Sequence, residues 1–172
     1  MTRSSWRLPW FFLLVLGPAC AGDGLPDAAT CQATLSDASL PDTAEEATAA
    51  RAAGQSWTDA QIRTIYICRA LQIGPENALW VKAGADAQTR ARRAWQIRHD
   101  ARLTARAMMA DPEAVKALQA RDQERYGSPD GPSFDWLLKH DADKGLSGDA
   151  VYEAIVESAQ RTDGEVNRSA GL

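Results

Sequence analysis

Histidine and cysteine are scarce in this chain, which has 172 residues but only 2 His and 3 Cys. Two His leave little room for a multi-histidine metal centre. An excess of positive charge is also missing, because 19 Lys and Arg face 23 Asp and Glu and the formal net charge is -4. This balance argues against a protein that binds nucleic acid through an overall basic field. Long apolar runs are absent beyond the first twenty residues, so we expect no transmembrane helix in the processed protein.

The apolar run that opens the chain has the form of an export signal. Arg3 and Arg7 precede an apolar stretch over residues 8–16, and small residues follow as far as Cys20. Such a stretch is too short for a permanent membrane helix and is typical of a secretory signal. We therefore expect a signal peptide over residues 1–20, and its removal makes the chain more acidic because both arginines leave with it.

Two routes of processing fit the end of this signal. The small residues before Cys20 resemble a bacterial lipoprotein box, in which Cys20 becomes the acylated first residue, although Gly17 stands where Leu is usual. Ala19 and Ala21 also satisfy the small-x-small rule of an ordinary signal peptidase, which would release the protein into the periplasm. We expect the first route, which predicts a lipid anchor at Cys20 in the outer membrane, on the periplasmic side of the cell envelope.

The other two cysteines predict a disulfide bond. Cys31 and Cys68 form an even pair in an oxidising compartment. Neither has a nearby His in the sequence to activate it as a nucleophile. The bond would fasten the start of the processed chain to the first firm helix.

Two segments follow the signal. Residues 21–56 are rich in Ala, Asp, Thr, Gly and Pro and hold few large apolar side chains, which predicts a flexible tether with a weak helix over 43–53. From residue 57 the pattern becomes helical, and no window alternates as a strand would. We expect residues 57–172 to form an all-α domain, an irregular orthogonal bundle of five to six helices with a frayed C-terminus.

Caps and breakers set the expected helix boundaries. They predict helices over 58–73, 76–82, 86–109, 111–126, 133–144 and 147–159. The expected N-caps are Thr58, Asp86, Asp111, Ser133 and Ser147. The expected helix stops are Gly74-Pro75, Gly84, Gly127 and Gly145.

A stripe of arginines is the most unusual feature of the domain. Arg98, Arg102 and Arg106 recur every four residues and so lie on one helix face, beside Trp95. Guanidinium groups on one face bind phosphate or carboxylate, so these four residues are the candidate binding site. The alternative is an internal ion pair, because Asp122 falls on the inner face of the next helix and Arg98 or Arg102 would serve as its partner. Trp95 would then be part of the core.

Two His-Asp pairs suggest a second function. His99, then His140 with Asp141, then Asp163 follow the H…HD…D order of the metal-dependent phosphohydrolases of the HD superfamily. The alternative function is therefore a metal-dependent hydrolase, a phosphoesterase or a toxin-like enzyme, that uses these four residues. The plain explanation is two surface His residues near helix ends.

Two segments carry a resemblance to known proteins. Around Arg98–Arg106 and Tyr126–Pro132, the sequence resembles uncharacterised predicted lipoproteins of myxobacteria and similar high-GC Gram-negative bacteria, over roughly residues 57–168. The resemblance implies export and carries no activity. The main prediction is thus a non-enzymatic, lipid-anchored module, without a cofactor, that binds an envelope protein or an anionic envelope component and no nucleic acid.

Overall fold

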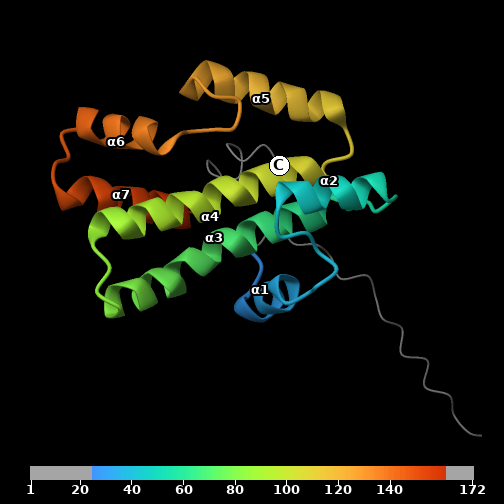
Figure 1. Ribbon diagram of the computed structural model, residues 1–172, viewed down its shortest axis with the longest axis horizontal. Helices are drawn as coiled ribbons and strands as arrows, with labels where there is room; N and C mark the ends of the chain where they lie inside the picture. The colour runs from blue at the N-terminus through green and yellow to red at the C-terminus, as the bar shows by residue number, and fades with distance from the viewer. Residues whose placement is uncertain (1–24, 162–172) are drawn as a thin grey trace, which may run out of the picture.

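The computed structural model describes residues 25–161, and all of their regular structure is helical (Figure 1). The predicted all-α class is confirmed: of the seven helices in this part of the chain, five lie after residue 57, where five to six were expected. The seven helices are α1 (Ala28–Leu35), α2 (Ala44–Ala52), α3 (Asp59–Lys82), α4 (Ala87–Met108), α5 (Pro112–Tyr126), α6 (Phe134–Asp143) and α7 (Asp149–Gln160). The predicted signal peptide, Cys20, residues 21–24 and Asp163 lie outside the described residues.

The centre of the fold is the long pair of α3 and α4, which run side by side (Figure 1). Helix α1 packs against α3, α2 against α4, and α7 against both members of the pair and against α6. Two hydrophobic clusters lie along this pair. The first, which includes Ala47, Trp57, Ile62 and Met108, joins α2, the start of α3 and the end of α4. The second cluster joins the end of α3 and the start of α4 to α6 and α7, with Ile73, Ala91, Ala94, Phe134 and Ile155 among its members.

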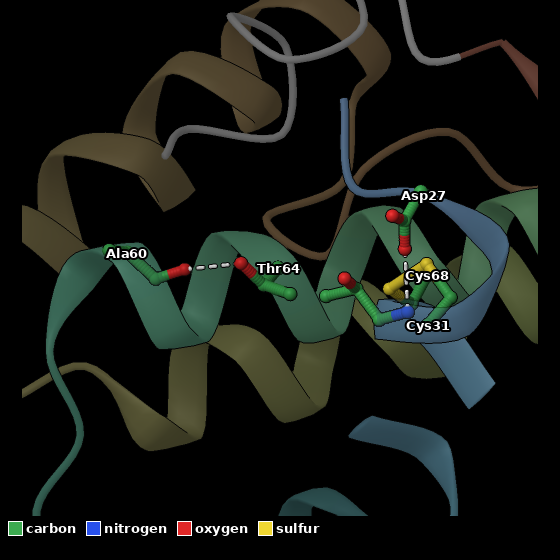
Figure 2. The surroundings of a disulfide bond; sticks show 6 residues. Asp27, Cys31, Ala60, Thr64 and Cys68 are labelled. Carbon is green, nitrogen blue, oxygen red and sulfur yellow. Dashed lines mark hydrogen bonds between the residues drawn. A yellow bond between two sulfur atoms is a disulfide. The ribbon is translucent and has the colours of Figure 1, made fainter. Parts of the chain in front are cut away.

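Within the expected tether, α2 lies where the sequence predicted a helix over 43–53, whereas α1 and the packing of both helices against α3 and α4 were not expected. The disulfide between Cys31 and Cys68 joins α1 to α3 (Figure 2). Ala47 of α2 is fully buried, and the Arg69 guanidinium donates to the carbonyls of Pro41 and Asp42, at 2.7 and 2.9 Å. Small side chains and a cross-link therefore order a segment that has too few large apolar residues to form a core by itself.

Helix α3 also differs from its prediction, since it continues through Gly74 and Pro75 to Lys82. Proline lacks the N–H that would bond to the preceding turn, so a helix end was the local expectation. Packing explains the continuation: Ile73 is fully buried in the second cluster. A Cβ on Gly74 would lie 3.0 Å from the Gln160 side chain, so the glycine allows α7 to approach closely.

The predicted caps agree with the structure except at the last helix. Thr58, Asp86, Asp111 and Ser133 each accept a hydrogen bond from a backbone N–H in the first turn of their helix. Helix α7 instead follows Gly148, which has φ 58° and offers no side-chain cap, so the predicted cap at Ser147 is wrong. No described helix has both the length and the apolar character needed to cross a bilayer.

Candidate functional site

The arginine stripe lies on α4 and faces the inside of the protein. Arg98, Arg102 and Arg106 are only 7%, 8% and 5% exposed. A buried cation needs partners that compensate for the water it has lost. What each guanidinium contacts therefore decides whether the stripe is structural or functional.

The main partner of the stripe is the turn over residues 129–132, between α5 and α6. The donors and their distances to backbone carbonyl oxygens are Arg106 to Pro129 at 2.6 Å, Arg102 to Asp130 at 3.4 Å and Trp95 Nε1 to Pro132 at 3.0 Å. Two prolines and the φ of 90° at Gly131 constrain this turn. It therefore presents a short row of carbonyl groups to one face of α4.

The predicted internal ion pair is present, with a different arginine from those expected. Asp122 of α5 is 1% exposed. Its carboxylate accepts from Arg106 Nη2 at 2.5 Å and from Arg121 Nη2 at 3.0 Å. Arg106 thus has a structural role and does not line the pocket described below.

Arg98 and Arg102 have other surroundings. Arg98 donates to the carbonyl of Arg161 at 3.1 Å and lies over the Tyr66 ring, 4.4 Å from its centroid. Arg102 contacts no carboxylate within the part of the chain that the structure describes. Its Nε atom is buried there without an acceptor. Arg102 is therefore a buried cation that nothing in residues 25–161 neutralises directly.

Both of these arginines line a pocket of about 540 Å³. The pocket lies between α4, the end of α5, α6 and α7, and its volume is in the usual range for small-molecule sites. The structure brings six predicted residues together in its wall: Arg98, Arg102, Trp95, His99, His140 and Asp141. The stripe residue Trp95 thus borders the second core cluster and the pocket at once.

Aromatic rings form a second part of the wall. The indole of Trp95 stacks on the His99 imidazole with centroids 5.0 Å apart, and that of Trp136 stacks on His140 at 4.5 Å. Tyr126 meets Trp136 edge-on at 4.9 Å. Neither Trp136 nor Tyr126 was among the site residues that we predicted from the sequence. A signal for Trp136 was present, because the pattern Trp-x-x-x-His-Asp occurs at 95–100 and again at 136–141.

The charged groups of the wall are mainly cationic. Its two carboxylates are already paired, Asp141 with Lys144 at 3.0 Å and Glu157 with Arg161 at 3.7 Å. Arg102 adds positive charge beyond these pairs. Burial, and then the positive charge of Arg102, lowers the pKa of His99 below its usual value. Both effects favour the neutral form of the His99 imidazole.

The alternative metal site is not assembled by the described residues. No group of three His, Cys, Asp or Glu within 25–161 lies close enough to hold a metal ion. His99, His140 and Asp141 share the pocket wall, and Asp163, the fourth predicted residue, lies outside the described part. Such a site would need ligands about 2 Å from a common centre.

No family model, curated protein or solved structure matches this chain. Proposals about its function therefore depend on the sequence signals and on the pocket itself.

Proposed function

We propose that this protein is an exported helical binding protein of the bacterial cell envelope that takes an anionic ligand into the pocket between α4, α5, α6 and α7. The observation that carries the proposal is Arg102. Its guanidinium is 8% exposed, lines the pocket and has no carboxylate partner among the described residues. A phosphate or carboxylate group is the natural partner for such a cation.

The folding stability that the buried charge of Arg102 is expected to remove supports this function. A buried charge without a counter-charge destabilises the folded state, and such groups occur where a ligand supplies the missing charge. The neighbouring Arg106 has its counter-charge in Asp122. The two residues, one helical turn apart, thus provide a comparison between an arginine that serves a ligand and one that serves the fold.

The test uses inorganic phosphate as the probe and thermal unfolding of the purified protein as the measurement. We expect phosphate to raise the melting temperature relative to chloride at equal ionic strength, because a ligand that binds only the folded state stabilises it. Arg102→Met should abolish this shift and leave the unliganded protein at least as stable as the wild type. Arg93→Gln, on the exposed side of the same helix, should keep the shift. Equal shifts in wild type and Arg102→Met would contradict the proposal.

Location is tested separately. The proposed lipid anchor predicts that the wild type partitions with membranes and that Cys20→Ser moves the protein to the soluble periplasmic fraction. A wild type found only in the soluble periplasmic fraction would refute the anchor and leave the binding proposal standing.

A further inference from the structure

The pocket offers aromatic rings as well as positive charge for the recognition of a ligand. Five of its wall residues carry aromatic rings: Trp95, His99, Tyr126, Trp136 and His140. They come from α4, from the last residue of α5 and from α6. Rings of this number in a pocket of about 540 Å³ form a surface suited to a small flat molecule.

The two Trp-His pairs repeat one arrangement on two helices. In each pair the residues are four apart, on one helix face, with interplanar angles of 20° for Trp95 and His99 and 21° for Trp136 and His140. The histidine therefore covers part of its tryptophan and limits how that indole can turn. The repeat of Trp-x-x-x-His-Asp in the sequence is the cause of this repeat in space.

Further contacts fix the two tryptophans in position. The indole N–H of Trp95 donates to the Pro132 carbonyl at 3.0 Å, and its ring meets Phe134 edge-on at 5.9 Å. Trp136 is held by the edge of Tyr126. Rings held in position before binding lose little conformational entropy when a ligand stacks on them.

Arg102 lies beside this ring surface. It is next to the turn that also binds Trp95, since both side chains donate to carbonyls of residues 130–132. His99 lies three residues before Arg102 on α4 and is half-buried. The same wall therefore offers a flat apolar surface and a cation, within the reach of one small molecule.

We infer that the pocket selects a small ligand in which a planar ring carries a phosphate or carboxylate group, with the ring stacked on the Trp95 and Trp136 pairs and the anionic group bound by Arg102. This inference rests on the proposed anion-binding function and adds the class of ligand to it. A bare metal ion would use neither the stacked rings nor the guanidinium.

The experiment compares three phosphates by calorimetric titration of the purified protein: inorganic phosphate, phenyl phosphate and cyclohexyl phosphate. The last two carry rings of similar size, and only phenyl is planar and aromatic. We expect phenyl phosphate to bind roughly tenfold more tightly than either of the others, the gain typical of one stacked ring. Benzoate in place of phenyl phosphate then shows whether the anionic group is preferentially a phosphate or a carboxylate.

Two variants assign the contributions to residues. Trp136→Leu should remove the preference for phenyl over cyclohexyl phosphate. Trp80→Leu, a partly buried tryptophan outside the pocket wall, should keep the preference. Arg102→Met should weaken the binding of all three phosphates.

The outcomes separate the two proposals. Equal affinities for phenyl and cyclohexyl phosphate in the wild type would overturn the planar-ring inference and leave the anion pocket intact. A preference that survives Trp136→Leu would overturn the assigned stacking surface. Phosphates that all fail to bind, or that bind Arg102→Met as well as the wild type, would overturn the proposed function itself.

Discussion

Arg102 and Gly131 illustrate how closely a buried cation can depend on the backbone beside it. A Cβ built on Gly131 would lie 2.5 Å from Arg102 Nη1, so the guanidinium occupies the space that any other residue would fill. Gly131 also has φ 90°, a conformation that favours glycine. The glycine thus meets two demands at once, the shape of the turn and the position of the arginine.

This double demand makes Gly131→Ala a specific prediction. We expect it to lower the free energy of unfolding by about 1 to 2 kcal/mol through backbone strain. Displacement of the Arg102 guanidinium, which is the end of a flexible side chain, should add about 1 kcal/mol, the lower end of the cost of overpacking. The measurement is urea unfolding.

The matched control is Gly54→Ala. Gly54 also has φ 90°, but a Cβ there meets nothing within 4 Å, so only the backbone cost applies. In the Gly131→Ala, Arg102→Ala double variant, the extra cost should disappear. Equal losses at the two glycines would show that Arg102 does not depend on this contact.

At the residue scale, the sequence predicted the members of the site better than their partners. The four-residue spacing of the arginines placed them on one face, and Asp122 was correctly expected to be buried with an arginine. The carbonyls of the turn over 129–132 could not be predicted as acceptors, because every residue has a carbonyl and only the path of the chain selects those that face α4. The shared pocket likewise depends on how α4, α6 and α7 pack.

Helix α5 is an element held to the fold in an unusual way. Its single buried residue is Asp122, which lies in the ion pair with Arg106. Removal of one member of a buried pair leaves the other charge uncompensated. The stability of α5 should therefore depend on one carboxylate more than on apolar contacts.

We predict that Asp122→Asn lowers the free energy of unfolding by about 3 to 5 kcal/mol. Hydrogen exchange should increase across α5, because the helix loses its buried contact. Chemical denaturation and amide exchange measure the two effects. Glu113→Gln is the control on the same helix: it breaks the exposed pair with Lys116, whose atoms are 2.9 Å apart, and should cost about 1 kcal/mol or less. Similar losses in both variants would refute the structural role of Asp122.

Helix α1 depends on a covalent link. Cys31 is its single buried residue, and the disulfide to Cys68 closes a separation of 37 residues (Figure 2). The Asp27 side chain caps the helix at Thr30, a local bond that does not connect it to α3. The cross-link is thus the firmest connection between α1 and the rest of the fold.

We predict that the Cys31→Ser, Cys68→Ser double variant loses about 3 to 4 kcal/mol of stability, the chain-entropy value for a loop of this length. Amide protection in α1 should fall most. Urea unfolding and hydrogen exchange, with and without a reductant, measure both. The reductant should reproduce the loss in the wild type and have no effect on the double variant. Unchanged protection in α1 after reduction would mean that noncovalent packing is sufficient.

The element boundaries show which signals are local. Thr58, Asp86 and Asp111 were predictable caps because a cap bonds within its own turn. The continuation of α3 through Pro75 was not, since it depends on the packing of Ile73 and on the approach of Gln160 from α7. At these places tertiary packing overrides the local preference of the sequence.

At the scale of the whole molecule, residues 25–161 contain two hydrophobic clusters, which raises the question of whether this part unfolds in one step. Both clusters use α3 and α4: Ile62 and Met108 belong to the first, and Ile73 and Ala94 to the second. Neither cluster can lose its packing without releasing part of a helix that the other needs. Shared helices therefore predict one cooperative transition over residues 25–161.

Substitution in one cluster tests this prediction through a probe in the other. Met108→Ala removes a side chain that is 1% exposed in the first cluster, and it should cost about 2 to 5 kcal/mol. In protein labelled with fluorotryptophan, the fluorine signals of Trp57 and Trp95 report the first and second cluster separately. We expect Met108→Ala to shift the urea midpoint of both signals equally, and Ile155→Ala, in the second cluster, to do the same. A shift confined to the signal of the substituted cluster would mean that the halves unfold independently, and the continuous α3 and α4 would then have to melt in segments.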